Sequence, residues 1–147
     1  MKNLSLFVLT VVLAVSCAKY PEGGLRKLAK GHIMGEWKMN AYFMNGFDYS
    51  DTVLVQNFIE TFNEGGTFER AYIDTAGAYH SYGGGWDIAG ERTVLKIFAD
   101  STYKLTPMVN NTATNFTIDR LTKEDLWYSF ESSNGTHQLR LARLNKE

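Results

Sequence analysis

Three histidines are the first candidates for chemistry in this sequence, because an imidazole can bind a metal ion or transfer a proton near neutral pH. They are His32, His80 and His137. No two of them have the His-x-His or His-x3-His spacing that suits one metal ion, and no acidic cluster supplies a further ligand. We therefore expect surface or partly buried histidines and no metal site.

Serine and glycine motifs do not indicate catalysis either. His80-Ser81 lacks the Gly-x-Ser-x-Gly pattern of a nucleophile elbow. The glycines of Gly83-Gly84-Gly85-Trp86 are not followed by a helix pattern whose N-terminus could bind phosphate. The sequence predicts no catalytic residues, no cofactor and a protein that is not an enzyme.

The single cysteine lies at an informative position. Cys17 follows a short basic start and an apolar stretch over residues 4–15, which fits the core of a signal peptide and is shorter than the roughly 20 residues that span a bilayer. The segment Ala14-Val15-Ser16-Cys17 resembles the lipobox of bacterial lipoproteins, which are cleaved before the cysteine and acylated on it. We expect a signal peptide at residues 1–16 and a membrane anchor of acyl chains on Cys17. An ordinary secretory signal is the alternative.

The residues after Cys17 bear on localisation. In such lipoproteins an Asp after the cysteine retains the protein at the inner membrane, and Ala18 stands there in this chain. This favours the outer membrane. A single Glu22 is a short version of the acidic run that sends some lipoproteins to the cell surface, so the periplasmic face and the cell surface both stay open.

The composition narrows the class of protein. The chain has 147 residues, a net charge of -1 and 44% hydrophobic residues, which suits one folded domain and argues against a nucleic-acid-binding protein. Aromatic residues make up 14%, with 13 Gly and only 2 Pro, as in β-proteins with many tight turns. One cysteine excludes an internal disulfide.

Alternating apolar and polar residues predict an all-β fold. A short helical turn over residues 25–30 precedes a first strand at 36–44, in which Trp37, Met39, Ala41 and Phe43 share one face. A second strand is expected at 53–62, and the glycines at 83–85 predict a bulge or a bend. Eight or nine sequential strands favour an antiparallel up-and-down barrel, which has no exposed edges. An open sandwich is the alternative.

Several motifs in this order resemble the lipocalin-like domain lipoproteins of the Bacteroidetes. They are Gly35-Glu36-Trp37, the segment from Phe62 to Phe68, Gly85-Trp86-Asp87-Ile88 and the segment from Phe116 to Leu126. The likeness covers residues 33–144. The lipobox, Pro21 and the helical turn predict a lipidated tether with a short helix at 17–33, and the likeness implies a lipocalin-like barrel at 34–147. It also implies that Trp37 closes one end of the barrel beneath Arg140 or Arg143, as a structural cation–π pair.

The aromatic residues suggest a binding function. Phe43, Tyr72, Tyr82 and Tyr128 are expected on the inner face of the strands, where they would line a pocket for a hydrophobic small molecule or simply fill the core. The first reading predicts a lipid-anchored, non-catalytic ligand-binding barrel of the cell envelope. The alternative is a solid barrel that binds a protein or glycan through the loops at 45–52 and 99–111.

Three Asp-Ser/Thr pairs resemble the O-glycosylation motif of the Bacteroidetes. They place candidate glycans on Thr52, Thr75 and Ser101. Because Asp-Ser/Thr is also common in turns, ordinary turn chemistry is the alternative explanation.

Overall fold

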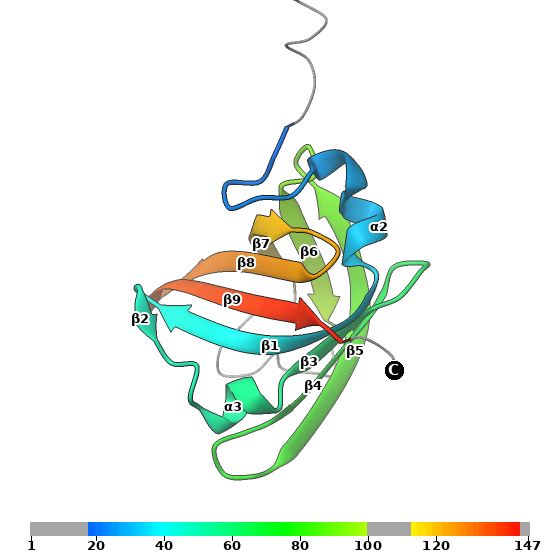
Figure 1. Cartoon of the computed structure of the whole chain (residues 1–147). Coiled ribbons are helices and arrows are strands. Elements are labelled where there is room, and N and C mark those ends of the chain that lie inside the picture. Colours follow the sequence, from blue (N-terminus) through cyan, green and yellow to red (C-terminus); the bar gives the residue numbers. More distant parts are fainter. Residues whose placement is uncertain (1–17, 100–112, 145–147) are drawn as a thin grey trace, which may run out of the picture.

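The computed structural model describes residues 18–99 and 113–144, which form a nine-stranded antiparallel sheet with short helical segments (Figure 1). The strands are β1 (Gly35–Met44), β2 (Phe47–Asp48), β3 (Ile59–Phe62), β4 (Thr67–Ile73), β5 (Tyr79–Ala89), β6 (Val94–Ala99), β7 (Ala113–Leu121), β8 (Asp125–Ser132) and β9 (Gly135–Arg143). From β3 onward each strand pairs with the next one along the chain.

The sheet closes on itself because β1 pairs with β9 as well as with β3. One edge of β1 pairs with β3 at its start and with the short β2 at its end, and β9 runs along the other edge. Eight strands thus form the barrel, and β2 is an extra strand. This confirms the predicted antiparallel barrel and excludes the open sandwich. Closure also pairs the edges that an open sheet would leave exposed.

The helical segments lie before and after β1. The 3-10 turn η1 (Arg26–Leu28) and the helix α2 (Ala29–Ile33) precede it, and α3 (Val53–Gln56) follows β2. Ala29 and Ile33 are fully buried against the barrel. None of the helices in the described ranges is long and apolar enough to cross a bilayer.

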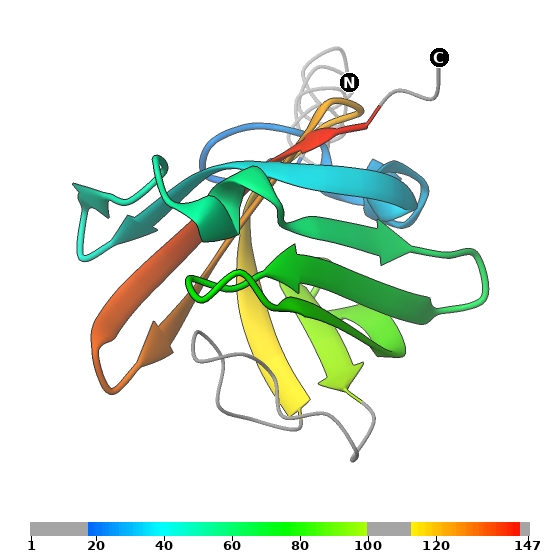
Figure 2. The same ribbon diagram turned by 90° about the horizontal axis from the view of Figure 1, so that it is seen from below.

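The two ends of the barrel differ. The end covered by α2, here named the closed end, also holds the β3–β4, β5–β6 and β7–β8 turns. The opposite end, here named the open end, holds β2 and the β4–β5 and β8–β9 turns. In Figure 1, α2 lies at the upper right and β2 beside the β8–β9 turn at the left. Figure 2 shows the same separation of α2 and β2 from below.

A bulge in β1 corrects the predicted inner face of this strand. The pairing of β1 with β9 skips a residue between Met39 and Ala41, so Asn40 is the extra residue of the bulge. Trp37 and Met39 are buried, as the alternation predicts, but after the bulge it is Tyr42 that is buried. The prediction that Phe43 lines the interior is therefore wrong, because one inserted residue inverts the alternation.

The structure differs from one other local prediction and selects between the two alternatives of a second, the bulge or the bend at the glycines of β5. Residues 53–56 form the helical turn α3, which packs against β1 and β4, and strand β3 begins only at Ile59. The three glycines of β5 contain no bulge, since β5 pairs with β4 in a continuous register up to Gly85 and with β6 from Gly84 onward. These glycines instead mark the place where β5 leaves one neighbour and joins the other, as at a barrel bend.

Candidate functional site

A buried ion pair lies at the centre of the barrel. Glu60 of β3 and Arg70 of β4 are direct partners in the sheet register, and their side chains are 0% and 2% exposed. The Arg70 Nε donates to Glu60 Oε1 at 2.7 Å, and Arg70 Nη2 donates to the same oxygen. The other inward-facing side chains of the two strands include several aromatic rings. Glu60 and Arg70 therefore form a layer of charge, here named the charged layer, inside an otherwise apolar barrel.

Two tyrosines complete this charged layer. Arg70 Nη1 donates to the hydroxyl of Tyr82 at 2.7 Å, and the Tyr128 hydroxyl donates to Glu60 Oε1 at 2.9 Å. Burial raises the pKa of Tyr82 to about 12 and that of Tyr128 well above its usual value. Burial opposes the charge of Arg70, but Glu60 and the two tyrosines raise its pKa above the ordinary value. At neutral pH the Arg70 guanidinium of this layer is therefore charged, and the two tyrosine hydroxyls are neutral.

One acceptor in this layer is not used. Glu60 Oε2 is buried and has no hydrogen-bond partner among the residues that the structure describes. A buried carboxylate oxygen without a donor costs free energy, because it has lost its water. The aromatic rings of Phe58 and Phe68 meanwhile hold the guanidinium of Arg70, whose Cζ lies 4.9 and 5.4 Å from their centroids. The site can thus accept a hydrogen bond from a donor beside an apolar wall.

Aromatic side chains line the barrel between this layer and the open end. Three of them keep a small exposure, namely Tyr42 and Phe130 at 8% and Tyr72 at 5%, as does Tyr82 of the charged layer at 5%. At the closed end Trp37 and Leu126 are at 0%, and Ile88 is at 8%. Phe130 stacks on His137 with centroids 4.6 Å apart. The wall near the open end is therefore aromatic and partly accessible.

Two histidines face this aromatic region. His137 is buried, with Nδ1 2.7 Å from the Tyr42 hydroxyl and Nε2 2.6 Å from Ser132 Oγ. Burial lowers the pKa of His137, so the neutral ring is favoured. His80 is more exposed. It stacks on Tyr72 with centroids 4.8 Å apart, and its Nε2 lies 2.7 Å from Asp74 Oδ2.

The structure also places the other predicted site residues. Tyr72, Tyr82 and Tyr128 lie inside the barrel, and Tyr82 and Tyr128 belong to the charged layer. Phe43 lies on the outer face, where the Cζ of Arg140 is 4.5 Å from its centroid.

The closed end decides between the two arginines that were candidates for the contact with Trp37. The Cζ of Arg143 lies 4.2 Å from the Trp37 centroid, and Arg143 donates to the carbonyl oxygens of His32, Met34 and Lys123. Arg140 lies over Trp127 on the outside instead. Trp37 Nε1 donates to Ile33 O at 2.7 Å, which ties α2 to the barrel.

The structure says less about the predicted lipidation and glycosylation positions. Cys17 and Ser101 lie outside the described residues. Thr52 is half-exposed, and Thr75 is exposed in the β4–β5 turn. In that turn Asp74 accepts hydrogen bonds from the backbone N–H groups of Ala76 and Ala78, which is ordinary turn chemistry. Within 18–99 and 113–144, no three His, Cys, Asp or Glu side chains gather as a metal site would require.

Sequence reasoning missed the ion pair, although a signal for it was present. Arg70 alternates with Phe68 and Tyr72, and Glu60 alternates with Phe58 and Phe62. A charged residue at the same parity as aromatic neighbours on two adjacent strands indicates an interior pair of opposite charge.

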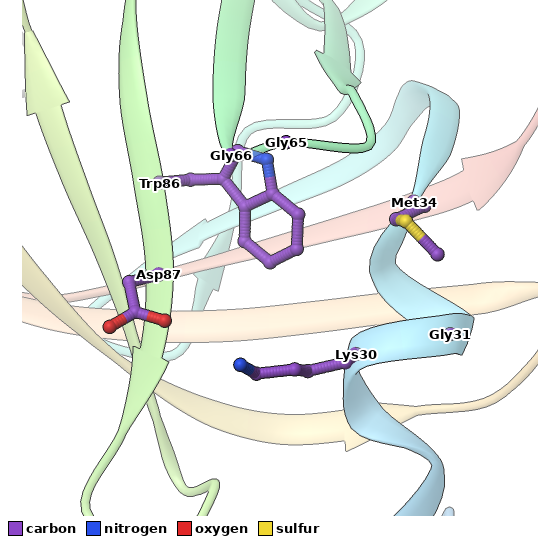
Figure 3. Close-up of a pocket in the computed structure, with 7 residues that line it drawn as sticks. All are labelled: Lys30, Gly31, Met34, Gly65, Gly66, Trp86 and Asp87. Carbon is purple, nitrogen blue, oxygen red and sulfur yellow. The ribbon is translucent and has the colours of Figure 1, made fainter.

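A pocket of about 480 Å³ lies at the closed end, between α2 and the β3–β4 turn (Figure 3). Lys30 and Gly31 of α2, Met34, Gly65 and Gly66 of the turn, and Trp86 and Asp87 of β5 line it. In Figure 3 the Lys30 ammonium points toward Asp87 and the indole of Trp86. No predicted site residue belongs to this pocket.

Comparison with known proteins bears on the fold. No protein-family model matches the sequence. No curated protein matches it either. Solved structures do match: a lipocalin-like protein from Bacteroides uniformis has 16% identity and a TM-score of 0.58 over 78% of this chain and 100% of that chain. The fold of this chain is lipocalin-like.

Two further structures share the lipocalin-like barrel. An uncharacterized protein from Bacteroides eggerthii has 13% identity and a TM-score of 0.56, over 76% of this chain and 99% of that chain. Apocrustacyanin C1 has 16% identity and a TM-score of 0.50, over 88% of this chain and 74% of that chain. At these identities the likeness concerns the fold and not the site.

Proposed function

We propose that this protein is a non-catalytic, lipid-anchored barrel of the bacterial cell envelope, attached to the outer membrane, that binds a small apolar molecule near its open end. The observation that carries the binding proposal is the unused Glu60 Oε2 in a charged layer beneath aromatic walls. Apolar walls with a few placed polar groups are typical of small-molecule sites. The ligand class is an aromatic or aliphatic molecule with one hydrogen-bond donor.

The anchor and the location are supported by the sequence. The apolar segment before Cys17, the lipobox resemblance and Ala18 after the cysteine all favour an acylated protein of the outer membrane. Acyl chains in pairs give stable attachment, whereas a single chain binds a bilayer only weakly.

The binding proposal can be tested with N-phenyl-1-naphthylamine, an apolar fluorescent probe with one N–H donor. We expect saturable binding by the wild-type protein and a Kd about fivefold higher for Phe130→Leu, which removes a ring from the inner wall. Phe43→Leu makes the same change on the outer face and should leave the Kd unchanged. Urea unfolding of both variants verifies that they are folded.

Native mass spectrometry of the protein purified from bacteria provides a second readout. A small molecule lost on mild activation would support an occupied interior. A bare chain that also fails to bind the probe would refute interior binding, and so would equal Kd changes in the Phe130 and Phe43 variants.

A second function is favoured by a specific observation. Among the described residues, three exposed large aromatic side chains lie at the open end: Phe47 at 70%, Tyr79 at 69% and Tyr49 at 40%. Exposed aromatic rings of this kind mark interaction surfaces. A barrel with this rim would bind a protein or glycan partner, and Phe47→Ser with Tyr79→Ser should then abolish that binding while the probe still binds.

A further inference from the structure

The chain immediately after Cys17 is docked on the barrel. Arg26 N donates to Ala18 O at 3.1 Å, and Lys19 and Leu25 form a β-bridge. Tyr20 is 2% exposed, and its hydroxyl donates to Arg92 O at 2.6 Å. The first described residues, in the segment predicted to be a lipidated tether, are therefore held on the barrel by backbone and side-chain contacts.

Further contacts extend this docking along the segment. Glu22 N donates to Asp119 O at 2.8 Å, and Leu121 N donates to Gly23 O at 3.2 Å. Gly24 has φ +98°, and a Cβ there would lie 1.8 Å from Leu121 O. The segment thus approaches β7 so closely that only glycine fits at this position.

This docking fixes where an anchor on Cys17 would enter a membrane. Cys17 is joined to Ala18 by one peptide bond, and consecutive Cα atoms are about 3.8 Å apart. Acyl chains on Cys17 would leave the protein beside η1, at the closed end. The barrel would then lie against the bilayer, with no spacer of free chain between them.

The surface beside this point has the chemistry of a membrane contact. Residues 18–33 carry four cations, Lys19, Arg26, Lys27 and Lys30, and one carboxylate. That carboxylate, Glu22, lies near Arg140 and Gln138 on the outer face of β9. Leu28 is 41% exposed between the exposed Lys27 and Lys30. Lysine ammonium groups attract anionic lipid headgroups, and an exposed leucine can enter the apolar layer beneath those headgroups.

We propose that the closed end rests on the anionic surface of the membrane through Lys27 and Leu28, with the open end directed away from the bilayer. This orientation rests on the proposed acyl anchor. It presents the aromatic open end to soluble ligands or partners, since η1 and α2 lie at the end of the barrel opposite β2 (Figure 1).

The test uses full-length protein with its native N-terminus, extracted from bacterial membranes. Leu28→Cys and Tyr79→Cys each introduce one thiol for a nitrobenzoxadiazole label, at an exposed apolar position of the closed and the open end. Intact mass first establishes whether Cys17 is acylated. The proteins are then placed in vesicles of phosphatidylcholine and phosphatidylglycerol that contain a headgroup spin-labelled lipid. We expect quenching at position 28 to be at least about threefold stronger than at position 79.

A matched pair of charge reversals tests the lysine contact. Lys27→Glu should weaken quenching at position 28, whereas Lys38→Glu, an exposed lysine in β1, should not. An acylated protein with equal quenching at both labels, or stronger quenching at position 79, would overturn the orientation and leave the anchor standing. An intact mass without acyl chains would refute the anchor and the orientation together, while binding of the naphthylamine probe would be unaffected.

Discussion

At the scale of single residues, the barrel interior depends on a charged pair that water does not solvate. Glu60 and Arg70 lie opposite each other on neighbouring strands, with tyrosine hydroxyls as further partners. Removing both charges of a buried pair is often tolerated, whereas removing one leaves the other uncompensated. The pair therefore contributes to the stability of the barrel as well as to the proposed binding site.

This argument predicts the outcome of a double-mutant cycle. Arg70→Met should lower the free energy of unfolding by about 3–5 kcal/mol, because Glu60 stays buried without its cation. Adding Glu60→Leu should restore most of that loss. Urea unfolding of the wild type, both single variants and the double variant measures the coupling. Arg120→Met breaks a half-exposed pair with Asp125 and should cost only about 1 kcal/mol. A loss of that size for Arg70→Met would mean that the pair is hydrated.

The lowered pKa values of two histidines predict how the free energy of unfolding depends on pH. Burial lowers the pKa of His137 and of His32 below 6.5 in the folded protein. Between 6.5 and the lower folded value, the unfolded chain binds more protons, so stability falls as the pH falls through this window. One proton contributes at most about 1.4 kcal/mol per pH unit. His137→Gln should reduce the slope measured by urea unfolding at pH 5 to 7.5. An unchanged slope would contradict a neutral, buried His137.

At the scale of elements, the closed end is held by the N-terminal segment and α2. Arg143 of β9 donates to backbone carbonyls of the segment before β1 and of the β7–β8 turn, and Trp37 is tied to the last turn of α2. The Tyr20 hydroxyl anchors the preceding segment to the β5–β6 turn, and burial raises its pKa to about 12. These contacts make residues 18–34 part of the folded barrel.

Two glycines of this segment provide a matched test. Gly24→Ala should destabilise the protein by more than about 2 kcal/mol, because the new Cβ meets Leu121 O in a left-handed backbone conformation. Gly31→Ala in α2 meets nothing within 4 Å and should be neutral or stabilising by about 0.5–1 kcal/mol. Urea unfolding and amide exchange of residues 18–25 measure the two effects. Equal effects of the two substitutions would argue against the docked segment.

At the scale of the whole molecule, the two ends expose different side chains. The closed end exposes Leu28 among lysines, and the open end exposes aromatic rings such as Phe47 and Tyr79. An asymmetric barrel of this kind has one end suited to an anionic surface and one suited to stacking partners. The candidate glycosylation positions Thr52 and Thr75 lie toward the open end, away from the proposed membrane contact.

The glycosylation prediction can be examined on protein from a host of the Bacteroidetes. We expect an intact mass above that of chain plus acyl groups, with the extra mass on peptides containing Thr52, Thr75 or Ser101. Thr75→Ala should remove the part attached in the β4–β5 turn. A mass equal to chain plus lipid alone would refute modification at all three positions.

The sequence by itself determined the sequential order of the strands and a count of eight or nine, because alternation and turn residues are local signals, but it did not predict the short β2. It also placed Trp37, Tyr72, Tyr82 and Tyr128 inside the barrel. The fold class could be predicted from these local signals. The inward direction of the three tyrosines followed from the alternation of inward and outward side chains along a strand.

Only the tertiary structure decided the features that depend on pairing across strands. The bulge at Asn40 moved Phe43 outside and Tyr42 inside, since the register of β1 is set by β9, a hundred residues later. Packing on β1 turned residues 53–56 into a helix. The Glu60–Arg70 pair, the choice of Arg143 over Arg140 and the docked N-terminal segment likewise arise from contacts between distant residues, which no local pattern of the sequence specifies.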